Sequence, residues 1–96
     1  MEPITKTVRL SATLRRLAEA KKIEVDLEPD ATVRDLFRTI TQTHPALAEF
    51  ILASSAELKP GIQLLVDGRH IDFLDGVETS LGQARDIFII PPIMGG

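Results

Sequence analysis

The fold is decided by the stretch KIEVDLEPDATVRDLF, residues 22–37. In it, the two-residue hydrophobic period of a strand is followed by the hydrophobic spacing of a helix. Apolar and charged residues alternate strictly over 22–28, which is the pattern of a half-buried strand. Pro29 and Asp30 then favour a turn, and proline donates no hydrogen bond to a sheet. We therefore predict a strand over 22–28 that ends at this turn.

After the turn, apolar residues recur at helical spacing on one face. Thr32 offers a hydroxyl at the cap position, and Asp35 stands three residues later in a box-like arrangement. Pro45 disfavours helical geometry in the residue before it. These signals predict a long helix that begins at Thr32 and ends near His44.

On the N-terminal side, residues 6–12 alternate as a strand does, and residues 12–18 carry apolar side chains at the spacing of a short helical turn. On the other side, residues 46–53 fit either a second short helix or a packed loop. The polar stretch that follows, through Lys59-Pro60-Gly61, favours turns.

The C-terminal third predicts three more strands. Residues 62–66 form the first, and Asp67-Gly68 is a strong hairpin signal because glycine tolerates a positive φ. The chain then returns as a strand over 69–73. A turn-rich link over 74–82 leads to a last β-favouring run over 86–90.

This order of elements predicts an α+β fold, in which one main helix crosses a mixed sheet of about five strands, as in the β-grasp or ubiquitin-like fold. We expect one domain over residues 1–90 and an extended tail over 91–96. The run over 87–90 is apolar on both faces, although one long helix covers only one face of a sheet. Either the other face carries an apolar, protein-binding patch, or short helices and loops cover it.

Composition narrows the possible functions. A chain of 96 residues has room for one domain and little for a large substrate cavity. It contains no cysteine, so it forms no disulfide and supplies no thiol nucleophile. The net charge of −3 argues against nucleic-acid binding. No apolar stretch approaches the length of a membrane span, and the N-terminus lacks a signal peptide, so we expect an unprocessed cytoplasmic protein without membrane partners.

Isolated polar residues do not build a catalytic or metal site. His44 and His70 lack a second ligand at a recognisable spacing, so we expect no bound metal. The sequence offers no set of nucleophile, base and orienting group. We therefore predict that the chain is not an enzyme and holds no cofactor of its own.

The most informative feature is the tail, Pro91-Pro92-Ile93-Met94-Gly95-Gly96. Two prolines remove two sheet donors and favour an extended chain. At about 3.1 to 3.5 Å per residue, the tail reaches roughly 20 Å, far enough to enter another protein's active site. The glycines lack side chains, so the carboxylate of Gly96 is unhindered and open to activation by an ATP-dependent partner.

Several stretches together resemble the MoaD/ThiS family of sulfur carriers, and most of all its molybdopterin synthase small subunits. The resemblance lies in the first strand and helix, the start of the long helix, the hairpin, the Phe73-Leu74-Asp75-Gly76 corner and the Pro-Pro-x-x-Gly-Gly tail. One departure is the stretch 82–86, where relatives usually carry a glycine-acid turn before the last strand. We expect a changed turn and an unchanged fold there.

The resemblance implies a reaction cycle. An E1-like enzyme adenylates Gly96 with ATP, a sulfur donor converts it to a thiocarboxylate, and this group delivers sulfur to a pterin precursor on the large subunit of molybdopterin synthase. Another sulfur acceptor would use the same tail. The candidate partner-binding residues are apolar side chains of the corner, the last strand and the tail: Phe73, Leu74, Phe88, Ile90, Pro91, Pro92, Ile93 and Met94.

Three other interpretations stay open. The activated Gly96 could be joined to lysines of target proteins, as in archaeal ubiquitin-like modifiers. The sulfur could serve tRNA thiolation. Alternatively, the chain is a plain β-grasp interaction domain whose terminal glycines are incidental, in which case adding a residue after Gly96 would leave its activity intact.

Overall fold

The computed structural model describes residues 2–11 and 13–92. These residues form a five-stranded sheet of order β2-β1-β7-β5-β6. The central pair, β1 and β7, is parallel, and the other neighbouring strands are antiparallel. The predicted mixed sheet is thereby confirmed. The strands are β1 (Ile4–Leu10), β2 (Lys22–Leu27), β5 (Gln63–Val66), β6 (Arg69–His70) and β7 (Ile87–Ile90).

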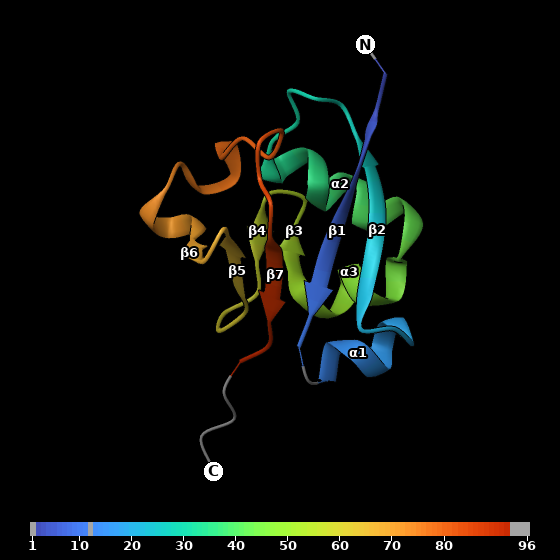
Figure 1. Ribbon diagram of the computed structural model, residues 1–96. Coiled ribbons are helices and arrows are strands. Elements are labelled where there is room, and N and C mark those ends of the chain that lie inside the picture. Colours follow the sequence, from blue (N-terminus) through green and yellow to red (C-terminus); the bar gives the residue numbers. More distant parts are fainter. Residues whose placement is uncertain (1, 12, 93–96) are drawn as a thin grey trace.

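The described part of the chain has three α-helices: α1 (Thr13–Ala18), α2 (Val33–Thr43) and α3 (Pro45–Ile51). Helices α2 and α3 pack on one face of this sheet, and α1 lies at its end. Figure 1 shows α2 and α3 behind the strands. The core lies between the sheet and these helices, because all three helices and every strand of this sheet except β6 contribute fully buried or nearly buried apolar side chains. Its largest fully buried members include Phe37, Leu36, Ile40, Leu10 and Ile89.

The main helix starts where the sequence predicts. The carboxylate of Asp35 accepts a hydrogen bond from the backbone N–H of Thr32 at 2.9 Å, which satisfies a donor that the helix leaves free at its start. At the other end, the N–H of His44 donates to the carbonyl of Ile40 at 2.7 Å. Pro45 then occupies the first turn of α3, where its missing N–H costs nothing. The ambiguous stretch after Pro45 is thus a helix.

A small second sheet follows α3 and was not predicted. It consists of β3 (Leu52–Ser54) and β4 (Glu57–Leu58), paired antiparallel with an irregular register. Its strands are too short to show an alternating pattern. The N–H of Lys59 donates to the carbonyl of Ile51 at 2.8 Å, which ties the end of the hairpin back to α3.

The predicted strand over 69–73 is wrong beyond His70. Only Arg69 and His70 pair with β5, and Ile71–Phe73 form a 3₁₀ turn, η1. The ring Nδ1 of His70 accepts the N–H of Asp72 at 3.1 Å, so a local hydrogen bond replaces the sheet ladder. A second 3₁₀ turn, η2 (Gly76–Glu78), lies in the predicted link.

The first strand also differs from its prediction, since it covers Ile4–Leu10 and not 6–12. Its partner decides the boundary, because β2 pairs with it from Ile4 opposite Leu27 to Arg9 opposite Lys22. The ammonium of Lys6 donates to the carbonyls of Gly82 and Ala84 at 3.0 and 2.8 Å. This contact holds the turn before β7 in place.

A membrane-crossing helix would have to be longer and more apolar than any helix formed by residues 2–11 and 13–92.

Candidate functional site

The chain leaves the sheet from its central strand. Strand β7 lies between β1 and β5 and runs directly into Pro91 and Pro92, which are half-buried. Figure 1 shows this exit at the end of the sheet where α1 lies, and the N–H of Ser11 donates to the carbonyl of Ile89 at 3.2 Å there. The tail therefore starts next to the sheet and at one end of it. The predicted site residues Ile93, Met94, Gly95 and Gly96 lie outside the described residues.

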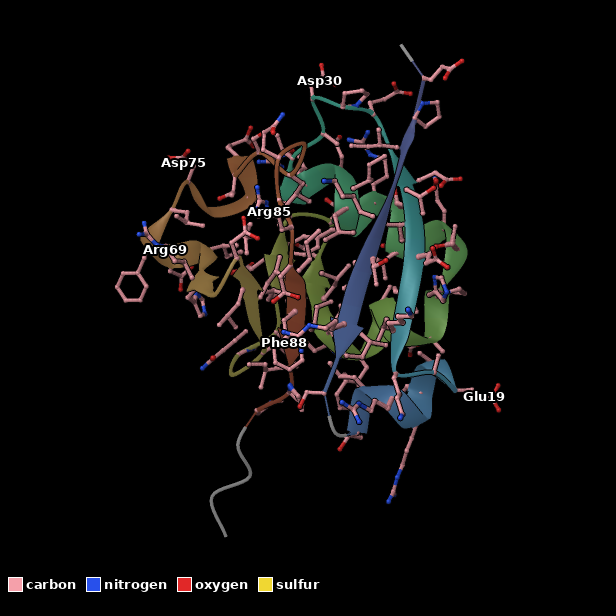
Figure 2. All side chains as sticks on the ribbon, in the orientation of Figure 1. Glu19, Asp30, Arg69, Asp75, Arg85 and Phe88 are labelled. Carbon is pink, nitrogen blue, oxygen red and sulfur yellow. The ribbon has the colours of Figure 1, made fainter. Side chains whose placement is uncertain are left out.

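Beside this exit lies an apolar patch on the face of the sheet away from the helices. It consists of Leu65, Phe88 and Ile90, which we call the open-face patch. All three side chains are half-buried, whereas their neighbours Leu64, Val66, Ile87 and Ile89 are buried in the core. Leu65 stands directly opposite Phe88 in the antiparallel pair. Figure 2 shows Phe88 near the end of β7, close to the exit.

Arg9 of β1 borders this patch on its other side. It is the parallel neighbour of Phe88, and its guanidinium carbon lies 4.1 Å from the centre of the Phe88 ring. Its Nε and Nη2 donate to the two carboxylate oxygens of Asp86 at 2.6 and 2.8 Å. The bidentate geometry fixes the guanidinium plane over the ring. Arg9 thus forms a charged edge of the patch, and the carboxylate of Asp86 holds it in position.

This ion pair changes the titration of both partners. The hydrogen bond from Arg9 lowers the pKa of Asp86 below its ordinary value, and the hydrogen bond to Asp86 raises the pKa of Arg9. The carboxylate of Asp67 accepts the N–H groups of Arg85 and Asp86, both at 2.8 Å. The start of β7 is therefore held by the hairpin turn on one side and by Arg9 on the other.

The two candidate residues of the corner have different environments. Phe73 is 85% exposed, and its ring meets His70 edge to face with 6.4 Å between the ring centres. Leu74 packs against the core. Because His70 stands opposite Leu65, a row of side chains leads from Phe88 through Leu65 and His70 to Phe73. The structure thus connects Phe73 to the patch only through His70, and it turns Leu74 inward.

Sequence reasoning did not single out Arg9 or Leu65 as site residues. A signal existed for Leu65, since it lies between two core residues in a strand and must point to the opposite face. No comparable signal existed for Arg9. Its place beside Phe88 depends on the parallel pairing of strands that lie far apart in the sequence.

Within the part of the chain that the structure describes, no group of three or more histidine, cysteine or acidic side chains could hold a metal ion. His70 instead accepts the backbone N–H of Asp72, and His44 contacts the hydroxyl of Thr43 at 2.8 Å. Both histidines therefore serve the local structure of turns and helix ends.

Comparison with known proteins gives a consistent family. The model of the ThiS family matches residues 8–96. Small archaeal modifier protein 3 of Haloferax volcanii is 33% identical over 89 residues, which make up 93% of this chain and 96% of that protein. A candidate sulfur carrier protein of Archaeoglobus fulgidus is 35% identical over 74 residues, or 74% of this chain and 84% of that protein.

Among solved structures, the crystal structure of SAMP1 from Haloferax volcanii superposes with a TM-score of 0.81 at 26% identity, covering 97% of this chain and 100% of that chain. The fold is therefore the ubiquitin-like β-grasp that the order of elements predicts.

Proposed function

The chain belongs to the ThiS family, and from this premise we propose that it is a ubiquitin-like sulfur carrier that works through the carboxylate of Gly96. An E1-like partner activates this carboxylate, and a sulfur donor turns it into a thiocarboxylate. The observation that carries the proposal is the position of the open-face patch directly beside the exit of the tail. One partner can hold the patch and receive the tail at the same time.

The chemistry asks little of the carrier itself. An oxygen of the Gly96 carboxylate attacks the α-phosphorus of ATP, and pyrophosphate leaves with its bonding electrons. The outer sulfur of a persulfide on the sulfur donor then attacks the acyl carbon, and AMP leaves. A second thiol of the donor attacks the inner sulfur of this acyl disulfide, so that a disulfide forms on the donor and the outer sulfur stays on Gly96 as the thiocarboxylate. The partner must supply the magnesium ion and the positive charge that stabilise these steps. The carrier contributes an unhindered glycine and an extended chain.

Recognition would centre on Phe88, with Leu65 and Ile90 around it. Aromatic side chains at the centre of an interface supply a large share of the binding energy, and arginine is also frequent among such residues. Arg9 extends the surface on one side, and the exposed Phe73 extends it on the other. The tail residues Pro91 and Pro92 would continue the same contact toward the active site of the partner.

Intact-mass spectrometry tests the proposal directly. The full chain is incubated with the E1-like enzyme of its own organism, ATP and a sulfur donor. We expect the replacement of one terminal oxygen by sulfur, which disappears when ATP is omitted. A matched variant with one alanine added after Gly96 should show no such change. If the extended chain carries sulfur as well as the natural one, the proposal is wrong.

We further propose a pterin precursor as the sulfur acceptor, as in molybdopterin synthesis. The support is the likeness of the corner and tail to those of the synthase small subunits. The thiocarboxylate form, mixed with the large subunit of molybdopterin synthase and the precursor, should lose its sulfur to the pterin. Transfer to tRNA in a parallel reaction, with none to the pterin, would contradict this assignment.

Conjugation to proteins is the second candidate function, and the 33% identity with small archaeal modifier protein 3 favours it. In this case a lysine amine attacks the activated Gly96 and AMP leaves. Digestion of cell extracts should then yield peptides with the remnant of the tail on lysine. The two functions share the activation step, so an adenylated chain without sulfur, together with such peptides, would select conjugation.

A further inference from the structure

A single close contact lies at the point where the tail leaves the sheet. Strand β5 pairs with β7 so that Gln63 stands opposite Ile90. Continued by two residues, this register sets Gly61 opposite Pro92. The two residues are in fact in close contact, because a Cβ atom added to Gly61 would lie 2.8 Å from Cβ and 3.2 Å from Cγ of Pro92. Only glycine at position 61 leaves room for the proline ring.

The backbone that carries Gly61 is anchored. The N–H of Ile62 donates to the carbonyl of Lys59 at 3.1 Å, and the N–H of Lys59 donates to the carbonyl of Ile51 at 2.8 Å. Ile62 itself is buried in the core. The turn at 59–62 is thus fixed to α3, so a side chain added at Gly61 would displace Pro92 more readily than the turn.

Proline makes this contact directional. The ring fixes φ of Pro91 and of Pro92 near −65°, which removes two of the dihedral angles that could redirect the chain. Seating the second ring against the bare Cα of Gly61 restrains the chain further. The direction of the chain at Pro92 is then set by the body of the domain as well as by the two prolines.

We propose that Gly61 is a positioning residue, which directs the tail toward the active site of the activating partner through its contact with Pro92. This inference rests on the proposed function, because it concerns the delivery of the Gly96 carboxylate. A tail that is already aimed loses less freedom on binding. A misplacement of about 1 Å at the reacting group costs up to roughly a hundredfold in rate.

Gly68 offers a matched control. Its φ is +85°, against +86° for Gly61, so alanine meets the same backbone strain at both positions. No atom lies within 4 Å of a Cβ built at Gly68. Gly61→Ala and Gly68→Ala should therefore lower the melting temperature to a similar extent, and only Gly61→Ala should also disturb the tail.

The experiment measures ATP–pyrophosphate exchange by the activating enzyme with four variants: Gly61→Ala, Gly68→Ala, Pro92→Gly, and Gly61→Ala combined with Pro92→Gly. We expect Gly61→Ala to lower kcat/KM by about ten- to a hundredfold, with Gly68→Ala close to the unaltered chain. Pro92→Gly removes the ring that collides, so the double variant should be no slower than Pro92→Gly alone. Equal rates for the two alanine variants, or multiplied losses in the double variant, would overturn the proposal.

A second measurement needs no partner and separates this inference from the proposed function. In NMR spectra of the free chain, the α-protons of Gly61 should show cross-relaxation with the ring protons of Pro92. This signal should be lost in Gly61→Ala and kept in Gly68→Ala. Its absence from the natural chain overturns the contact itself. If the contact is present but the natural chain is never activated, the sulfur-carrier function fails, and with it the role of Gly61 in directing the tail.

Discussion

The two faces of β7 carry the same kind of side chain but have opposite environments. Ile87 and Ile89 are at most 1% exposed beneath the helices, whereas Phe88 and Ile90 are half-buried on the open face. Helices α2 and α3 pack on one side of the sheet, whereas Phe88 and Ile90 on the other side of the strand keep part of their surface exposed. Apolar character alone therefore does not separate residues that hold the fold together from residues that are available to a partner.

The open face carries apolar side chains, but a charged side chain covers part of their surface. Arg9 lies over the ring of Phe88 and is held there by Asp86. A charged side chain over the ring keeps the exposed apolar surface small. A partner with a complementary surface can still reach Phe88, Leu65 and Ile90. The comparison between the two faces can be tested by four substitutions of decreasing effect.

The largest effect is expected for Phe37→Ala on the covered side. Phe37 is fully buried at the centre of the core, so its truncation should lower the free energy of unfolding by about 3–5 kcal/mol. The matched control is Phe73→Ala, which should change it by no more than about 0.5 kcal/mol because that ring is 85% exposed. Urea unfolding followed by circular dichroism measures both. Similar losses for the two variants would contradict the assignment of the core.

The next effect concerns Gly82, in the segment that closes over the start of α2. A Cβ atom there would collide with the carbonyl oxygen of Pro29. Gly82→Ala should therefore force the two backbones apart and cost about 1–3 kcal/mol, the usual range for overpacking. A calorimetric melting curve gives the loss. An unchanged melting temperature would show that the segment at Gly82 is not packed tightly against Pro29.

A smaller change in stability is expected for Phe88→Ala on the open face. The half-buried ring and its contact with Arg9 should together contribute about 1 kcal/mol. Binding to the activating enzyme, measured by calorimetric titration, should weaken by at least about tenfold if Phe88 lies at the centre of the interface. Phe50→Ala is the control, because Phe50 is 38% exposed and belongs to α3 on the helical side. Equal weakening by both variants would show that the open face is not part of the interface.

The smallest effect is expected for Asp86→Asn, and it depends on pH. Because the pKa of Asp86 is lowered in the folded chain, its ionised form stabilises the fold above the ordinary pKa of an aspartate, about 3.9. This stabilisation is lost as the pH falls below that value through the lowered pKa. Both side chains of the pair are well exposed, so solvent screening keeps the contribution small.

Unfolding curves of the natural chain and of Asp86→Asn should therefore differ slightly at neutral pH and converge in acid. A difference that persists at pH 2 would show that the carboxylate acts through its shape and not through its charge.

Local patterns predicted much of the fold. The alternation over 22–28 and the cap at Thr32 identified β2 and α2 because each signal lies within a few residues of the element that it describes. The end of the strand at His70 could not be read in this way. It depends on the ring of His70 accepting the N–H of Asp72, and that geometry arises only in the folded turn.

The hairpin of β3 and β4 escaped prediction for a related reason. Its strands are too short to show an alternating pattern, and the hydrogen bond from the N–H of Lys59 to the carbonyl of Ile51 ties it to the rest of the domain. Among the candidate site residues, the pattern marked Phe88 and Ile90 as apolar, but it left open whether other elements cover them. The structure answered that question, because both side chains are only half-buried.

The amino-acid order by itself determined the periods of the strands and the main helix, the hairpin at Asp67-Gly68 and the exit of the chain at the two prolines. These features depend on backbone chemistry that acts over a few residues. Only the tertiary structure decided that Arg9 lies over Phe88 and that Gly61 leaves space for Pro92. Such contacts join segments that are distant in the chain, and their geometry exists only after the sheet has set its register.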